Sequence, residues 1–204
     1  ATVMSCQLPQ VSRLSVVAAL CAFCVNTWAG QPSWAGGNGN ASNGGNYSGN
    51  GNSTTAPGQS DRVKHSTGQM VIDAALTFGS LEFTGGSIVG SGLTPLPLTL
   101  ADATSDWTGG ELTSGATLNL PGLTIGAGSA KKLNNGAKLN LTGNTTWSGD
   151  DITTGSGSQF NNSGTFLATS SLKISHDSTL GSTRATFKND GTFTKSNATS
   201  GTTE

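Results

Sequence analysis

The sequence predicts an all-β protein whose folded part is a parallel β-solenoid (parallel β-helix), in which short strands wind into coils that stack on one another. Three observations predict this class. From about Val71 onward, apolar and polar residues alternate over short runs, as they do in strands with one buried face. That region shows no run of apolar residues at the three- and four-residue spacing of an amphipathic helix. Two short motifs recur along the chain, as expected for a repeat architecture.

The 204-residue chain carries few charges, with 10% charged residues and a formal net charge of -1. Gly occupies 30 positions, and Ser, Thr and Asn fill much of the rest, which suits strands and tight turns. A nucleic-acid partner needs a basic surface to neutralise phosphates, and the sequence has no Lys/Arg cluster, so no nucleic-acid partner is expected. The three cysteines, Cys6, Cys21 and Cys24, precede residue 25. This placement excludes a disulfide framework for the rest of the chain.

Residues 1–35 have the pattern of a secretory signal peptide. Arg13 precedes an uncharged apolar run from Leu14 to Val25, and small residues follow at two candidate cleavage sites, after Ala29 or after Ala35. A transmembrane anchor and a buried helix are the alternatives, but a helix of this length spans only about 18 Å of a ~30 Å hydrocarbon core. We therefore expect a secreted or cell-surface protein with no integral membrane segment in the mature chain.

Residues 36–70 are predicted to be a disordered, Gly/Asn-rich linker. The stretch from Gly36 to Gln59 contains one aromatic residue, Tyr47, and no aliphatic residue larger than Ala. Such a segment buries too little apolar area to offset the ~1–2 kcal/mol per residue that ordering the backbone costs. A glycosylated or ligand-binding tail is the alternative, because three Asn-x-Ser/Thr sequons lie here, at Asn40, Asn46 and Asn52.

Residues 71–204 are predicted to form the β-solenoid repeat domain. Its alternating runs are short and bounded by Gly, Asn, Ser or Asp, the residues that tolerate turn geometry. We expect each run to be a strand and each polar junction a turn. The chain ends at Glu204 shortly after a repeat, so further repeats or an anchor are expected beyond it. The clearest runs are Leu81–Phe83, Thr117–Leu120, Lys138–Leu141, Leu172–Ile174 and Thr192–Thr194.

An aromatic motif occurs three times in this domain. It reads aromatic, small hydroxyl, Gly, Gly or Asp, any residue, aliphatic. The copies are Phe83–Ile88, Trp107–Leu112 and Trp147–Ile152, and the second gap between them is the longer one. Because the aromatic position holds Phe in one copy and Trp in two, it is expected to be selected for apolar bulk.

A second motif places two apolar residues six positions apart around a Gly. An even spacing keeps both side chains on one face of extended backbone, while Asn and Gly between them permit a bend. A coil of two or three short strands can hide its interior only when coils stack. The copies run Leu112–Leu118, Leu133–Leu139, Phe160–Phe166 and Phe187–Phe193, and the last three start at equal intervals along the chain.

The two motifs define a predicted repeat core in which like residues of successive coils form ladders, such as Phe160 on Phe187 and Phe166 on Phe193. Burial of such ladders contributes roughly 25 cal/mol per Å². An antiparallel β-sandwich with Gly-rich turns is the alternative architecture, but a sandwich does not require a motif that recurs at equal intervals. The predicted core residues are Phe83, Ile88, Trp107, Leu112, Leu118, Leu133, Leu139, Trp147, Ile152, Phe160, Phe166, Phe187 and Phe193.

The Trp-Ser/Thr-Gly elements at Trp107 and Trp147, and the Asn-x-Gly-Thr-Phe-like elements at 161–166 and 188–193, resemble the parallel β-helix repeats of bacterial surface and secreted proteins. Autotransporter passengers and filamentous-haemagglutinin-like adhesins belong to this group. The resemblance covers residues 76–196. It implies a surface protein whose partners are host or environmental glycans or other surface proteins.

The carboxylate pair Asp150–Asp151 is the best catalytic candidate, with Asp102 and Asp106 as further members. Polysaccharide enzymes built on β-helices group carboxylates on one face, as acid and base or as calcium ligands. Adjacent residues of a strand point to opposite faces, so the pair could share a site only in a turn. Asp150 replaces a Gly of the aromatic motif, which is what a turn tolerates. A solvated turn is therefore the favoured interpretation.

Other residue types suggest no chemistry. His65 and His176 lie far apart with no Cys near them, so no metal site and no cofactor are expected. Trp107 and Trp147 could serve as sugar-stacking platforms, but their place in the repeat favours core packing. We expect a non-catalytic structural or adhesive module, not an enzyme. The alternative is a carbohydrate-active enzyme or a glycan-binding module.

Overall fold

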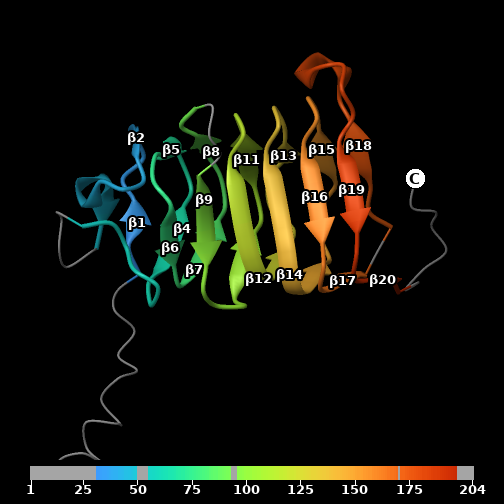
Figure 1. Cartoon of the computed structure of the whole chain (residues 1–204), viewed down its shortest axis with the longest axis horizontal. Coiled ribbons are helices and arrows are strands. Elements are labelled where there is room, and N and C mark those ends of the chain that lie inside the picture. The colour runs from blue at the N-terminus through green and yellow to red at the C-terminus, as the bar shows by residue number, and fades with distance from the viewer. Residues whose placement is uncertain (1–30, 50–54, 93–95, 170, 197–204) are drawn as a thin grey trace, which may run out of the picture.

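The computed structural model describes residues 31–49, 55–92, 96–169 and 171–196, and these residues form a parallel β-solenoid (Figure 1). They contain strands and two short 3-10 helices, η1 (Gly44–Asn46) and η2 (Ser178–Leu180), with no α-helix among them. The predicted all-β class and the predicted solenoid are confirmed. None of the described residues forms a helix long and apolar enough to cross a membrane. The signal-peptide prediction lies outside the described residues, except for positions 31–35.

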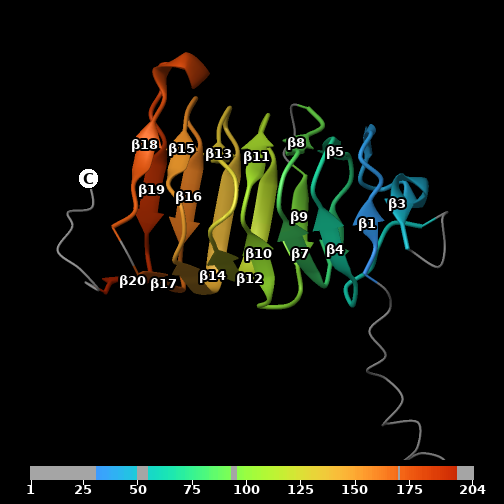
Figure 2. The same ribbon diagram turned by 180° about the vertical axis from the view of Figure 1, so that it is seen from behind.

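Each coil runs through three strand segments, and the equivalent segments of successive coils stack into three faces. The first face contains β1 (Ser33–Trp34), β4 (Arg62–His65), β7 (Ser80–Phe83), β10 (Ser105–Trp107), β17 (Thr165–Ala168) and β20 (Thr192–Lys195). The second face contains β2 (Asn38–Asn40), β5 (Gln69–Ile72), β8 (Ser87–Gly90), β11 (Gly110–Thr113), β13 (Lys131–Leu133), β15 (Ile152–Thr154) and β18 (Ile174–His176), which Figure 2 shows following one another along the long axis. The third face contains β6 (Leu76–Phe78), β9 (Pro97–Leu100), β16 (Gln159–Asn162) and β19 (Thr186–Asn189).

Two long strands connect the third face to the first. β12 (Thr117–Ile125) and β14 (Lys138–Trp147) pair in parallel along both halves, with a break in register between Leu120 and Gly122 where the chain rounds the corner. Their first halves pair with β9 and β16, and their second halves pair with β10 and β17. The two faces therefore form one continuous sheet.

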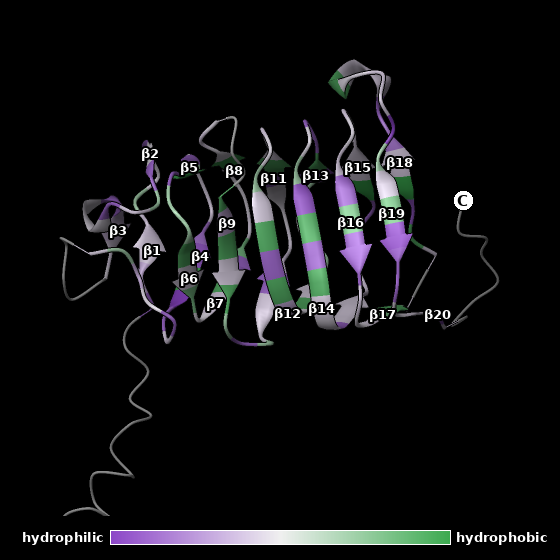
Figure 3. Ribbon diagram, in the orientation of Figure 1, coloured by the Kyte–Doolittle hydropathy of each residue, from purple (hydrophilic) through white to green (hydrophobic). Residues whose placement is uncertain are grey.

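Like residues stack in register inside the coils. On the third face, Leu118 lies beside Leu139, which lies beside Phe160, and all three are buried. Because alternate side chains point outward, apolar and polar bands alternate along β12 and β14 in Figure 3. The predicted core residues that the structure buries are Phe83, Ile88, Trp107, Leu112, Leu118, Leu133, Leu139, Trp147, Ile152, Phe160 and Phe166.

Coil length varies along the stack, which corrects one part of the predicted repeat. The predicted interval holds for Phe160, which lies beside Phe187. Phe160 is preceded on its ladder by Leu139 rather than by Leu133, and Leu133 stacks on Leu112 in the second face. The turn between the second and third faces and the corner between the third and first faces both place Gly between two apolar residues, so the sequence alone does not separate them.

The long gap between the Trp107 and Trp147 copies of the aromatic motif contains one complete coil. Trp107 pairs with Ile125, and Ile125 pairs with Trp147. Ile125 is fully buried at the aromatic position of the repeat. An aliphatic side chain fills this position in one coil, which explains why the aromatic motif skips it.

The described part of the expected linker forms coils instead, so the linker prediction is corrected here. Residues 36–70 contribute β2, β3 (Tyr47–Ser48), β4 and part of β5. Trp34, Ala41 and Tyr47 are buried, and the Tyr47 hydroxyl donates a 2.9 Å hydrogen bond to the Ala41 carbonyl. The Trp34 and Tyr47 rings pack edge to face at 5.2 Å. These two rings supply the apolar area that the surrounding Gly and Asn residues lack.

The two ends of the stack differ. At the N-terminal end, β3 pairs with β1 in the antiparallel direction and covers the edge of the first face. At the C-terminal end, the predicted ladders form, because the ring pairs Phe160–Phe187 and Phe166–Phe193 stack at 6.1 and 5.4 Å. Phe187 and Phe193 nevertheless keep 37% and 43% of their surface exposed. They were predicted as core, and they are instead the outermost layer, because no described coil lies beyond them.

Candidate functional site

Asp150 lies in the turn that connects the first face to the second. Its φ of 54° is left-handed, a conformation that Asp tolerates better than most residues. One carboxylate oxygen, Oδ2, accepts a 2.7 Å hydrogen bond from the Gly128 N–H and lies 3.4 Å from the Lys131 ammonium. The hydrogen bond from the Gly128 N–H, and to a smaller extent the Lys131 ammonium, lowers the pKa of the Asp150 carboxyl. Asp150 is therefore an ionised group that ties its coil to the preceding one.

Asp151 forms its hydrogen bond with the following coil, whereas Asp150 bonds to the preceding one. Its Oδ1 accepts a 2.8 Å hydrogen bond from the Lys173 N–H in the following coil. Asp150 and Asp151 thus contact opposite neighbours, and their carboxylates do not converge on one site. The predicted solvated turn is confirmed, and the structure brings together no acid/base pair at this position.

Lys131 has a buried side chain that was not predicted from the sequence. Its side chain has no exposed surface, and it occupies the inward row of the second face between Gly110 and Ile152. A buried ammonium needs a partner, and Asp150 provides it at the rim of the coil. Lys131 follows the alternation of its strand, so a Lys at an inward position is the signal that could have identified it.

Asp106 belongs to a cluster of charges on the outer surface of the first face. Its Oδ2 accepts a 2.6 Å hydrogen bond from Arg62 Nη2, and Arg62 Nε lies 3.7 Å from Glu82. Lys64 pairs with the other Glu82 oxygen at 3.1 Å. These residues come from β4, β7 and β10, so the ion pairs run from coil to coil. Asp102, the remaining candidate, is exposed and outside this cluster.

His65 is an interior residue. Its ring stacks on Phe83 with centroids 5.4 Å apart, and Nε2 lies 3.1 Å from the Ser87 carbonyl oxygen. Burial lowers the pKa of His65 to about 4, so the ring is neutral at pH 7. His176 lies in β18 near the opposite end of the stack. Among the described residues, no three His, Cys, Asp or Glu side chains gather as a metal site would require.

The predicted core role of the two tryptophans is confirmed. Trp107 and Trp147 expose 2% and 1% of their surface, which leaves no ring face for a sugar. The Trp147 Nε1–H donates a 2.9 Å hydrogen bond to the Asp150 carbonyl. This bond connects the core to the turn that carries the two carboxylates.

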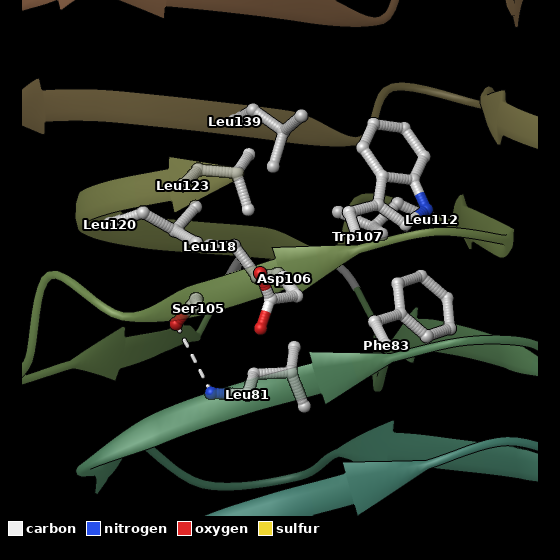
Figure 4. A pocket seen from close by; sticks show the side chains of 10 residues that line it. All are labelled: Leu81, Phe83, Ser105, Asp106, Trp107, Leu112, Leu118, Leu120, Leu123 and Leu139. Carbon is white, nitrogen blue, oxygen red and sulfur yellow. Dashed lines mark hydrogen bonds between the residues drawn. The ribbon is translucent and has the colours of Figure 1, made fainter. Parts of the chain in front are cut away.

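A small internal cavity beside Trp107 is a packing gap of about 10 Å³ (Figure 4). Its only hydroxyl group, from Ser105, already accepts a 3.1 Å hydrogen bond from the Leu81 N–H. A void of this size and lining is suited to neither a ligand nor a coordinated water. The other lining residues are Phe83, Asp106, Leu112, Leu118, Leu120, Leu123 and Leu139.

A row of amides follows the outer surface of the third face. Asn140 donates to the Asn119 side-chain oxygen, and Asn161 donates to that of Asn140, both at 2.8 Å. Asn119 continues the row to the Thr99 hydroxyl at 3.2 Å. The row crosses four successive coils. Polar groups on this surface are thus bonded to the equivalent groups of neighbouring coils.

The sequence matches no protein family, and no similar chain is found among curated proteins or solved structures. The parallel β-solenoid therefore rests on the strand register described above. The resemblance to adhesin and autotransporter repeats stays a prediction.

Proposed function

We propose that this protein is a non-catalytic structural or adhesive module, exported to the cell surface or the medium. The observation that supports this proposal is that polar side chains form hydrogen bonds and ion pairs between coils. Asp150, Asp151 and the amide row of the third face bond to the adjacent coil, and Asp106 bonds to Arg62 two coils away. Side chains used in this way stabilise a stiff rod.

The same bonds argue against the enzymatic alternative. A glycoside hydrolase holds two carboxyl groups roughly 5–10 Å apart so that both reach one glycosidic bond. Asp150 and Asp151 engage opposite coils, and Asp106 is neutralised by Arg62 on another part of the surface. Each carboxylate has a structural partner, so the scaffold role accounts for all three.

An activity screen with the Asp150→Ala variant separates the two functions. We expect no turnover of pectin, alginate or related glycans by the unmodified protein. The variant should have a lower Tm, because it leaves the buried Lys131 ammonium without its carboxylate. A second substitution, Lys131→Met, should recover part of the lost Tm by removing that charge.

Two results would contradict the proposal. One is turnover by the unmodified protein that Asp150→Ala or Asp151→Ala abolishes while the Tm is unchanged. The other concerns location: an antibody against the folded repeats should label intact producing cells or the medium, and labelling confined to permeabilised cells would exclude a surface role.

A further inference from the structure

The described part of the chain contains five Asn-x-Ser/Thr sequons, the acceptor sequence for asparagine-linked glycans. A glycan is bulky and hydrophilic, so a folded protein can carry it only on an Asn whose side-chain amide faces solvent and makes no contact between coils. The structure separates the five sequons by this criterion. Their asparagines are Asn40, Asn46, Asn140, Asn144 and Asn161.

Three of the five amides are used in contacts within the fold. Asn140 and Asn161 belong to the amide row of the third face, where each Nδ2 donates a 2.8 Å hydrogen bond to the side-chain oxygen of the preceding coil. The Asn46 Nδ2 donates to the Asn40 carbonyl at 2.9 Å, and a Cβ on Gly39 would lie 2.5 Å from it. A glycan on any of these nitrogens would have to displace a packed neighbour.

The side chain of Asn144 is exposed and makes no hydrogen bond with the other described residues. It lies in the first-face half of β14, where alternation turns Asn144 and Thr146, the two defining residues of the sequon, towards the outer surface. Its register partner in the preceding coil is Gly122, which has no side chain, and its partner in the following coil is Thr165. The glycine leaves space beside the Asn144 amide.

The exposure of Asn144 belongs to the side of the stack and not to one of its ends. Described coils flank it on both sides, so the amide faces outward whatever lies before the first coil or after the last one. Asn40 is also exposed, but it lies in β2, the outermost described strand of the second face. Asn144 is therefore the sequon that combines a free amide with a complete surrounding of described coils.

We propose that Asn144 is the attachment site of an asparagine-linked glycan. The inference rests on the proposed export, because sequons are modified in chains that enter the secretory route. The co-reactant is an oligosaccharide linked to a lipid pyrophosphate. A bond forms between the Asn144 Nδ2 and the anomeric carbon of the oligosaccharide, the bond from that carbon to the pyrophosphate oxygen breaks, and Nδ2 gives one proton to a base of the transferase. The coil then folds with the glycan on its outer side.

Mass spectrometry of the full chain, recovered from the surface or medium of producing cells, tests the assignment. Peptide-N-glycosidase in heavy-oxygen water converts a glycosylated Asn to a labelled Asp, and we expect this label at position 144. Asn144→Gln and Thr146→Val should lose the glycan mass, whereas Thr146→Ser, which keeps the sequon hydroxyl, should retain it. Thr142→Val is the matched control, because it removes the sequon of Asn140 in the same strand and should leave the glycan mass unchanged. A cooperative thermal transition verifies that each variant folds.

Three outcomes would overturn the site. They are an unlabelled position 144 in the exported protein, a glycan that Thr146→Val retains, and a loss of glycan in Thr142→Val equal to that in Asn144→Gln. The first outcome needs no variant, so it decides the question even where a substitution prevents folding. If the antibody labels intact cells but position 144 is unlabelled, the modification site fails and the surface role stands. If the protein is confined to permeabilised cells and carries no glycan, both fail.

Discussion

The His65 imidazole lies within the stack of interior rings, between Trp34 at 5.9 Å and Phe83 at 5.4 Å. A charged ring there would lose its hydration, and this burial lowers its pKa to about 4. The unfolded chain binds the same proton with a pKa near 6.5, so protonation favours unfolding. Stability contributed by the neutral ring is complete above about pH 6.5 and is lost as the pH falls towards 4.

The protein should therefore lose about 2 kcal/mol of unfolding free energy between pH 7.5 and pH 5 through His65 alone. In His65→Phe, which keeps an aromatic ring on the ladder, this loss should disappear. Urea unfolding at the two pH values measures it. The same pH dependence in both proteins would show that His65 is not the responsible group.

At the scale of residues, the sequence predicts apolar interior positions well and polar ones poorly. Leu118, Phe160 and Trp147 are buried as the alternation requires. Lys131, on the second face, and His65, on the first face, also point inward, but their polar side chains conceal this burial in a single sequence. Their burial depends on partners contributed by other coils, Asp150 for one and Ser87 for the other.

At the scale of elements, the corner between the third and first faces depends on glycine. Gly143 and Gly164 occupy equivalent corners of successive coils. A Cβ on Gly164 would lie 2.1 Å from the Gly143 carbonyl oxygen, and a Cβ on Gly143 would lie 1.8 Å from that of Pro121. Both contacts are with backbone, which cannot move aside without opening the ladder. Close stacking of corners therefore requires Gly here.

Gly164→Ala should destabilise the protein by at least about 1–3 kcal/mol, the range for overpacking a closely packed site. Gly37→Ala is the control, because a Cβ there meets no atom within 4 Å and the residue has no left-handed φ. The control should be within about 0.5 kcal/mol of the unmodified protein. Equal effects of the two substitutions in denaturant unfolding would refute the role of the corner glycine.

Strand existence was predictable from alternation, whereas the assignment of strands to faces was not. The Gly-containing segments at 134–137 and 161–164 both separate two apolar residues, yet the first is a turn between faces two and three and the second is a corner between faces three and one. Whether such a segment folds as a turn or as a corner depends on the neighbouring coil on which it stacks. The coils that include Trp34 and Tyr47 were missed because two rings, rather than a run of aliphatic residues, fill their interior.

At the scale of the whole molecule, the two ends of the described stack expose different groups to solvent. β3 covers one edge of the N-terminal end in the antiparallel direction, and the last described layer at the other end exposes two phenylalanine rings. The proximity of Phe160, His176 and Arg184 at that second end was not predictable from the sequence, because these residues come together only through coil stacking and the longer final connection.

In a parallel β-solenoid, residues of successive coils stack at a constant rise. Gln69, Ser87, Glu111, Lys132, Thr153 and Ser175 form one such outward row of the second face. Neighbouring strands are about 4.8 Å apart, so each coil adds that distance along the row.

Spin labels on this row, in a chain whose three cysteines are replaced by Ser, test whether the rise is constant. Double electron–electron resonance should give distances from position 69 to positions 132, 153 and 175 that increase by about 4.8 Å at each step, to about 24 Å for the last. A distance to position 175 equal to or shorter than that to position 153 would contradict the parallel stack, since it would mean that the chain folds back on itself.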